Sequence, residues 1–229
     1  MTSQGRAGAH ERLRDAAGRM SEALRPMCGD YCAEGSVANR KISLEMVQYY
    51  APELNARIRR ELKPTNGSWR TDETYVRVAG RWTYLYRAVD STGATIDFFL
   101  SETRDLAAAR TFFRNALAAP GHPRPRLINV DGNPSYPTAV EELKRNHTLG
   151  QRCRCGVVPY LNNIVEQDHR AIKRRIKASL GFRSFAAAER TIQGYEAMHM
   201  IRKGQIRWLP KGAIIEQVCF IKFIFGLAT

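Results

Sequence analysis

The order of the predicted elements indicates an α/β protein, built on a mixed sheet with helices on both faces. Three segments rich in β-branched and aromatic residues come first, separated by turn-forming residues at 79–80 and 90–93. They predict three antiparallel strands, and alternating helices and strands follow them. In this order the first and fourth strands can lie side by side at the centre of the sheet.

Strands are predicted from β-branched and aromatic content between turns, at 69–78, 81–89, 94–100, 126–130 and, as a strand or loop, 154–158. Helices are predicted from apolar residues three or four positions apart, at 52–62, 104–118, 134–145, 160–180 and 185–202. Pro52 fits the first turn of its helix, and Pro120-Gly121 ends the helix that begins at 104. The side chains of that second helix expected to face the interior are Leu106, Ala109, Phe113 and Leu117.

The chain divides by composition into four regions, 1–46, 47–68, 69–211 and 212–229. The first is poorly readable and lacks a recognisable helix-turn-helix, which needs two short amphipathic helices about a tight turn. The second is a short basic helix with a linker, and the third holds the sheet. The last is an apolar tail interrupted by Glu216 and Lys222, which favours a packing segment over a membrane anchor.

The chain is strongly basic, with a formal net charge of +14 and an isoelectric point near 10.0. Half of this excess falls between residues 166 and 211, where eleven Lys and Arg accompany four Asp and Glu. Such a concentration favours a nucleic-acid partner. A membrane is the weaker alternative, because no uniformly apolar stretch reaches the roughly 18 residues needed to span a bilayer.

The start of the chain carries charges and no apolar signal core, so a cytoplasmic location is expected. Five cysteines are too few and too scattered for a disulfide framework. Cys28 and Cys32, with Cys153 and Cys155, are conceivable zinc ligands, but their spacing fits common zinc motifs poorly. Reduced structural thiols are expected instead.

Three acidic residues stand at suggestive places in the predicted elements. Asp72 lies on the first strand, Asp131 directly follows the fourth, and Glu166 lies in the helix 160–180. Sites in open α/β sheets gather at strand ends where the strand order reverses, so we expect the two aspartates to meet. Each acid alone also has an ordinary interpretation, as a solvent-facing strand residue, a turn residue or part of a basic helix.

Carboxylates gathered at one point repel one another, and divalent cations usually compensate for that cost. Mg²⁺ takes carboxylate oxygens, keeps waters and binds substrate phosphate, which suits a site beside a basic surface. Two such ions can activate an attacking hydroxyl and stabilise the leaving oxygen of a phosphodiester. The pattern therefore predicts phosphoryl transfer on nucleic acid.

The helix 160–180 carries a basic stripe headed by its acid. Residues three, four and seven apart share a helix face. The residues expected along one side are Glu166, His169, Arg170, Lys173 and Lys177. Ile164, Ile172 and Ile176 should pack another side down. A solvated basic face is the alternative for the cationic residues, and His169 is interpreted as a packing or hydrogen-bonded residue rather than a metal ligand.

Between residues 47 and 211 the chain carries a series of motifs. They read QYYAPEL, WRTDETYVRVAGRWTYLYRAVDSTGATIDFFLS, NVDGNPSYP, YLNNIVEQDHRAIKRRI, LGFRSF and AMHMIRKGQ. Asp131 and Glu166 are separated by 34 residues, and Lys173 follows the glutamate by seven. In motifs and spacing the chain resembles the DDE transposases of bacterial insertion sequences, specifically the insertion sequence six family.

The resemblance implies an RNase H-like catalytic domain over 69–211, in which Asp72, Asp131 and Glu166 are catalytic and hold two Mg²⁺ ions, with Mn²⁺ as a substitute. Such enzymes cut double-stranded DNA at element ends with water, then use the freed 3′-hydroxyl to attack target DNA, without a covalent protein–DNA intermediate. Lys173 would hold terminal DNA beside the metals. The residues expected to contact phosphates are Arg170, Arg174, Arg175 and Lys177. A homo-oligomer, at least a dimer on DNA, is also implied, acting on bacterial nucleoid DNA.

Two departures from the family pattern keep other functions open. Family members carry a helix-turn-helix ahead of QYYAPEL, and residues 1–46 do not resemble it. A non-catalytic or end-recognition-defective DNA-binding remnant is therefore one alternative, and a general nuclease that cleaves without joining is another. Gly132 stands where a Lys is usual after the second aspartate, which weakens the expected phosphate grip.

Overall fold

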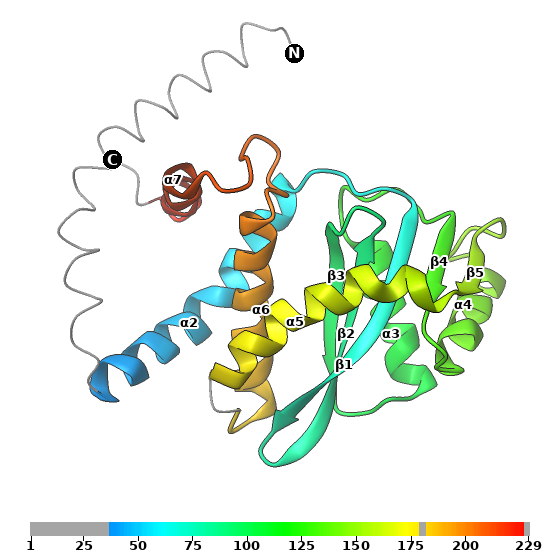
Figure 1. Ribbon diagram of the computed structural model, residues 1–229, viewed down its shortest axis with the longest axis horizontal. Coiled ribbons are helices and arrows are strands. Elements are labelled where there is room, and N and C mark those ends of the chain that lie inside the picture. Colours follow the sequence, from blue (N-terminus) through cyan, green and yellow to red (C-terminus); the bar gives the residue numbers. More distant parts are fainter. Residues whose placement is uncertain (1–36, 179–181, 227–229) are drawn as a thin grey trace, which may run out of the picture.

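The computed structural model describes residues 37–178 and 182–226, which form a five-stranded sheet packed with helices (Figure 1). The strands are β1 Ser68–Val78, β2 Arg81–Asp90, β3 Thr95–Ser101, β4 Leu127–Val130 and β5 Arg154–Val157. The α-helices are α2 Val37–Ile58, α3 Leu106–Ala118, α4 Ser135–Arg145, α5 Asn163–Ala178, α6 Phe185–Arg202 and α7 Ile214–Ile224. Two 3-10 turns are η1 Arg59–Glu61 and η2 Pro159–Asn162. Every strand and helix predicted between residues 69 and 202 is present, with ends shifted by a few residues at most.

The sheet has the strand order β3-β2-β1-β4-β5. The first three strands are antiparallel neighbours, whereas β4 runs parallel to β1 and β5 runs parallel to β4. Parallel neighbours need crossover connections, and α3 and α4 lie in these connections. The first and fourth strands are therefore adjacent at the centre, as predicted. This mixed order is the RNase H-like arrangement.

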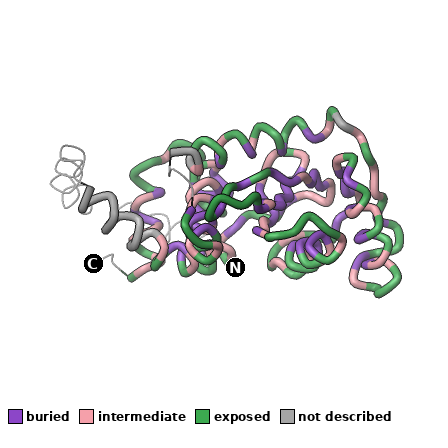
Figure 2. The backbone as a smooth tube through the Cα atoms, turned by 90° about the horizontal axis from the view of Figure 1, so that it is seen from below, coloured by how far each residue is buried: buried purple, intermediate pink, exposed green. Residues whose placement is uncertain are grey.

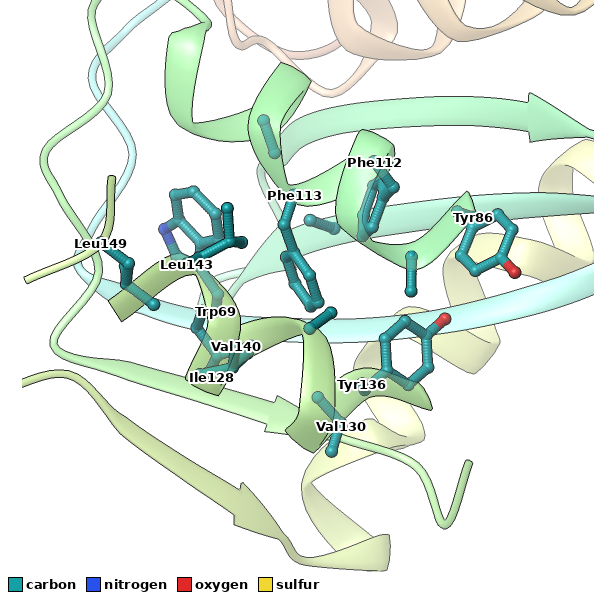
Figure 3. Packing of buried hydrophobic residues seen from close by; sticks show 14 of the residues in the cluster. Trp69, Tyr86, Phe112, Phe113, Ile128, Val130, Tyr136, Val140, Leu143 and Leu149 are labelled. Carbon is teal, nitrogen blue, oxygen red and sulfur yellow. The ribbon is translucent and has the colours of Figure 1, made fainter. Parts of the chain in front are cut away.

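Helices cover both faces of the sheet, and the buried residues run between them (Figure 2). On one face α3 and α4 close an aromatic core, whose largest members include Trp69, Tyr86, Phe112, Phe113 and Tyr136 (Figure 3). On the other face α5 and α6 pack on β1 and β2 through a second cluster, which includes Val76, Leu85, Ile172 and Ile192. The helices thus pack on both faces of the sheet, and a functional site can form at the strand ends.

The buried side of α3 differs in part from the predicted one. The helix begins after Asp105, whose Oδ1 accepts a hydrogen bond from the N–H of Ala108 at 2.8 Å. Phe112 and Ala116 are fully buried, whereas the predicted Leu106 and Leu117 are only partly buried. The helix packs on the sheet and on α4 at once, so its buried face is turned toward both.

The second correction concerns α2. The sequence predicts a helix over 52–62 that starts near Pro52, but α2 begins at Val37 and contains Pro52 in its interior. An interior proline removes a backbone hydrogen bond and costs about 3 kcal/mol. Burial offsets this cost, because Leu54 and Ile58 pack into a cluster shared with α6. Tertiary contacts therefore override the local signal.

The apolar tail forms α7 and packs as predicted, with Phe220 buried in the cluster shared by α2 and α6. Within the described residues, no helix has the length and apolarity to cross a membrane. Cys153 and Cys155 are free thiols. Residues 1–36, which include Cys28, Cys32 and most of the region without a recognisable helix-turn-helix, lie outside the described part of the chain.

Candidate active site

Two aspartates meet at the centre of the sheet. β1 pairs in parallel with β4, and the pairing sets Arg70 opposite Asn129. Continued by two residues, this register sets Asp72 beside Asp131, which directly follows β4. Ligand atoms of Asp72, Asp131 and the neighbouring Glu73 lie within 4.8 Å of one another. Strand pairing thus joins two acids that are far apart in sequence.

The helix α5 brings the third acid to the same place. Glu166 lies in the first turn of α5 and lines a pocket of about 250 Å³ together with Asp72 and Asp131. The other residues that line the pocket are Val130, Gly132, Val157 and Asn162. All three acids that the sequence singles out therefore face one cavity, from a central strand, a strand end and a helix start.

The start of α5 is fixed by Asn129 of β4. The Asn129 amide donates to the carbonyl of Val158 at 3.0 Å and to Oδ1 of Asn162 at 2.7 Å. Its Oδ1 accepts from the N–H of Val158 at 3.1 Å. Since α5 begins at Asn163, this fully buried side chain determines where the helix, and with it Glu166, starts. Asn129 belongs to the motif NVDGNPSYP, but no sequence signal predicts this role for it.

The carboxylates disfavour one another's charged forms. The pKa of Asp72 is raised to about 7, first by burial and then by the charges of Asp131 and Glu73. The pKa of Asp131 is also raised, by burial and then by Glu73. A bound cation would relieve this repulsion. Carboxylate oxygens are the donors that hard divalent ions such as Mg²⁺ prefer, so the donor set fits a divalent metal.

Glu73 is a buried acid that the sequence leaves unassigned. It accepts hydrogen bonds from the Tyr136 hydroxyl at 2.5 Å and from the Asn133 amide at 3.4 Å. The Arg104 guanidinium also donates to Glu73, and it lies 3.7 Å from Asp131. Because these donors already occupy its oxygens, Glu73 is better suited to fix its neighbours than to bind an ion. Glu73 is 8% exposed, so its charge is held inside the protein by these donors.

His169 lies on the buried side of α5, against Asp72. It is 4% exposed, and its Nδ1 is 3.6 Å from Oδ2 of Asp72. Burial, and then the charges of Arg87 and Lys173, lower its pKa to about 3, so the imidazole is neutral near pH 7. The sequence predicts His169 along one side of the helix with Glu166, Arg170 and Lys173; those three are exposed, whereas His169 lies on the buried side with Val165 and Ile172. Its burial supports the packing interpretation.

The basic side of α5 projects into solvent. Three of the predicted DNA-binding side chains are exposed, Arg170, Lys173 and Arg174. Two more lie on α5 with side chains outside the described part of the chain, Arg175 and Lys177. Val165 and Ile172 are fully buried beneath the helix, whereas Ile164, predicted to pack, is 36% exposed. The helix therefore separates a buried apolar side from an open cationic one.

A buried charge network that the sequence analysis missed anchors α5. Asp168 accepts hydrogen bonds from Arg87 of β2 at 2.6 Å and from Lys203 at 3.0 Å. Nε2 of His199 lies 2.7 Å from the same carboxylate. Arg87 is fully buried and also donates to the buried Glu196 of α6 at 2.9 Å. The network ties α5 to β2 and α6, two residues beyond Glu166, and its members come from motifs distant in sequence.

Comparison with known proteins gives relatives for most of the described chain. Residues 66–205 match the family described as a DDE domain. The transposase for the insertion sequence-like element IS431mec of Staphylococcus aureus is 36% identical over 163 residues, which cover 71% of this chain and 70% of that one. The transposase for insertion sequence element IS257 in transposon Tn4003 of Staphylococcus aureus gives the same values. Among solved structures, the HTLV-2 integrase catalytic core domain in complex with magnesium has a TM-score of 0.46 at 16% identity, covering 63% of this chain and 95% of that one.

Proposed function

Because the chain belongs to the DDE transposases of bacterial insertion sequences, in the insertion sequence six family, we propose that it cuts DNA at the ends of its element and joins the freed 3′-hydroxyl to target DNA. Transposases of this family are polynucleotidyl transferases. The proposal of DNA cleavage and joining rests on the pocket in which Asp72, Asp131 and Glu166 converge from three separate elements.

These three acids are expected to hold the divalent ions. When bound, two Mg²⁺ ions activate the attacking oxygen and stabilise the leaving oxygen of a phosphodiester, and Mn²⁺ is expected to substitute. The protein holds the carboxylates in fixed positions for this purpose. Oδ1 of Asp72 accepts from the Glu73 N–H at 2.8 Å, and Oδ1 of Asp131 accepts from the Asn133 N–H at 3.1 Å. Among the described residues Oδ2 of each aspartate has a basic neighbour, Arg104 or His169, only at 3.6–3.7 Å, so it is proposed as the donor atom for an ion.

The surroundings of Asp72 support a bound cation rather than a protein counter-ion. Within the described residues, the basic group in contact with its Oδ2 is His169 at 3.6 Å, and burial keeps that imidazole neutral. Arg104 donates to Glu73 instead. The closest basic neighbours of these acids are neutral or already paired, so metal ions compensate the acids best. The pKa of Asp72 near 7 also favours a bound cation.

The cationic side of α5 is expected to hold the DNA. Lys173 follows Glu166 by two helical turns, about 10 Å along the axis, and its exposed ammonium is proposed to hold terminal DNA. The residues proposed to contact phosphates are Arg170, Arg174, Arg175 and Lys177. Phosphate contacts position the duplex without reading its sequence, so they suit both element ends and arbitrary target DNA.

The proposed partners are double-stranded DNA and a second copy of the chain. Each chain supplies one set of three acids, and an element has two ends that must be cut and joined together. At least a dimer on DNA is therefore expected. Element-end recognition falls to residues 1–46 in this proposal, and the absence of a recognisable helix-turn-helix there is the observation that favours the remnant as a second candidate.

The experiment uses the full chain with labelled DNA carrying the inverted repeats that flank its gene, a target plasmid and Mg²⁺. Wild type should give cleaved ends and joined products, and Asp131→Asn should reduce both by at least 10³-fold, since each tenfold is about 1.4 kcal/mol of lost transition-state stabilisation. The matched control is Glu141→Gln, an exposed acid on α4 outside the pocket, which should retain full activity.

Three outcomes discriminate among the candidates. Equal joined products from wild type and Asp131→Asn would contradict the proposed site. DNA binding without cleavage, and without preference for inverted repeats, would identify a remnant. Cleavage without joining would identify a general nuclease.

A further inference from the structure

The sheet face that α3 and α4 cover is exposed farther out, along the hairpin of β1 and β2. On the face that α3 and α4 cover, Tyr86 is fully buried at the edge of the aromatic core (Figure 3). The same row continues outward along the hairpin of β1 and β2, where Tyr84 is half-buried, Tyr75 is 50% exposed and Trp82 is 59% exposed. Large aromatic side chains that are exposed together in this way form a contact surface.

The exposed rings are held in place. Tyr75 and Trp82 meet edge to face with centroids 6.1 Å apart, and Tyr75 lies 5.4 Å from Tyr84. The turn is tight, because Ala79 and Gly80 both have positive φ, and the N–H of Ala79 donates to the carbonyl of Phe182 at 2.7 Å. A surface fixed in this way loses little conformational entropy when a ligand binds.

The opposite side of the same hairpin is apolar and filled. Val76, Val78 and Phe182 are buried there in the cluster beneath α5 and α6. The described helices that pack on this hairpin therefore lie on its opposite side, and the exposed aromatic row is not part of the core. It carries Arg77 beside its rings, where the opposite face carries aliphatic residues.

The charge of this surface identifies the ligand. Arg77, the strand partner of Trp82, stacks over its ring at 5.8 Å and is exposed. Aromatic faces together with guanidinium groups bind planar bases and phosphates. A symmetric contact between two copies through this face would bring the two copies of Arg77 together, which like-charge repulsion disfavours.

The surface leads to the acid pocket. Alternate residues of β1 share a face, so Glu73, Tyr75 and Arg77 form one line at about 7 Å per step. At its inner end Arg104 connects Glu73 to Asp131. The rings therefore lie roughly 7–14 Å from Glu73, two to four nucleotide steps at the ~3.4 Å spacing of a stacked strand.

We propose that this hairpin face, made of Tyr75, Arg77, Trp82 and Tyr84, binds an unpaired stretch of DNA next to the phosphodiester that is cut. Bases stack on Trp82 and Tyr75, and Arg77 holds a phosphate. The inference rests on the proposed function for its choice of DNA. It adds that the DNA is unpaired at this point, so that its bases are free to stack.

Tryptophan fluorescence provides the test, because the chain has three tryptophans and only two are exposed. Trp69 is 1% exposed and Trp208 is 48% exposed. Replacing Trp208 by Phe therefore leaves Trp82 as the exposed tryptophan, and its fluorescence reports on bound DNA. The probes are a blunt duplex and the same duplex with a single-stranded extension on either strand. The extension is about six nucleotides long, a length within the site size of single-strand binding folds. The titration is carried out in EDTA, so that no cleavage occurs. The extended duplex should quench Trp82, and the blunt duplex should not.

Variants give an independent reading of affinity. Trp82→Ala should weaken binding of the extended duplex about tenfold or more and binding of the blunt duplex less than about twofold, with Trp82→Phe close to wild type. Trp208→Ala is the matched control and should change neither. Equal quenching by both probes, or equal loss of both affinities in Trp82→Ala, would overturn the proposal. So would a Trp82→Ala protein that binds both probes normally but self-associates less, which would identify a contact between copies.

The outcome is separable from the proposed function. Asp131→Asn should keep the preference for extended DNA in EDTA, because binding does not need the metal site. Failure of strand transfer with this preference intact would count against the chemistry alone. Strand transfer without the preference would count against the hairpin face alone. The fluorescence titration retains the native Trp82, so it holds even if Trp82→Ala fails to fold.

Discussion

Replacement of Asp168 by asparagine tests whether the buried charge network holds α5, and thus Glu166, in position. The Asp168 side chain is 9% exposed and accepts from Arg87 at 2.6 Å and from Lys203 at 3.0 Å. Asparagine keeps the shape and an acceptor oxygen, but it leaves these cations with Glu196 as the remaining buried acid of the network. Loss of one member of a buried pair costs about 3–5 kcal/mol, and the retained acceptor favours the lower end.

The expected loss is large enough to measure by thermal or denaturant unfolding. For a chain of 229 residues, about 3 kcal/mol lowers the Tm by roughly 6–12 °C. The matched control is Glu141→Gln, which removes an exposed pair with Lys144 and should change the free energy of unfolding by less than about 1 kcal/mol. Amide exchange within α5 should also accelerate in Asp168→Asn, because the helix loses its tie to β2 and α6.

The pH dependence has a definite sign. Burial alone would raise the pKa of Asp168, but the hydrogen bond with His199 and the charges of Arg87 and Lys203 hold it well below its usual range. A carboxyl with a lowered folded pKa stabilises the fold above its unfolded pKa, about 3.9, and the stabilisation is lost as the pH falls toward the folded value. The cost of Asp168→Asn should therefore be constant from about pH 5 to 8 and shrink below about pH 4. A loss below about 1 kcal/mol at pH 7, or a cost that grows in acid, would refute the reasoning.

Four further changes follow from the site. Asp131→Asn should raise the free energy of unfolding of the metal-free protein by about 1 kcal/mol at pH 8 and by less at pH 5. The pKa of Asp72 in the folded protein is near 7, so ionisation of its carboxyl between about pH 4 and 7 destabilises the fold. Urea titration in EDTA measures the change, and a loss of stability would contradict the prediction. Glu73→Gln should destabilise by about 1–3 kcal/mol through its buried hydrogen bonds, and an unchanged Tm would show them to be unimportant. Lys173→Ala should leave the Tm unchanged and reduce the slope of log affinity against log salt by about 1, whereas an unchanged slope would exclude a phosphate contact. Gly132→Lys should tighten DNA binding, because a Cβ there meets nothing within 4 Å; weaker binding in a filter or anisotropy assay would contradict this.

Most of the sheet could be predicted because its signals are local. Each strand is a run of β-branched and aromatic residues between turns, and Asp131 is recognisable because it directly follows the buried strand β4. The meeting of Asp72 with Asp131 required only the strand order, which the element sequence limits strongly. The pocket shared with Glu166 agrees with this expectation.

The features that escaped prediction depend on contacts between distant residues. Asp168 reads as one more acid on a basic helix, and only the fold brings Arg87 and Glu196 to it. Pro52 signals a helix start, yet packing against α6 carries α2 through it. Trp82 alternates along β2 with the buried Tyr86, yet it is 59% exposed. Periodicity shows which residues share a face and leaves open what covers that face.

Metal rescue tests the central claim most directly. Asp131→Cys replaces a hard oxygen donor by a thiolate, which suits Mg²⁺ poorly and softer ions such as Mn²⁺ better. If Asp131 binds an essential ion, this variant should be inactive in strand transfer with Mg²⁺ and partly restored with Mn²⁺, while wild type works with both. Glu73→Cys is the matched control and should be rescued by neither, because Glu73 holds Tyr136 and Arg104 rather than a metal. An Asp131→Cys protein equally inactive with both ions, or a Glu73→Cys protein rescued by Mn²⁺, would contradict this assignment.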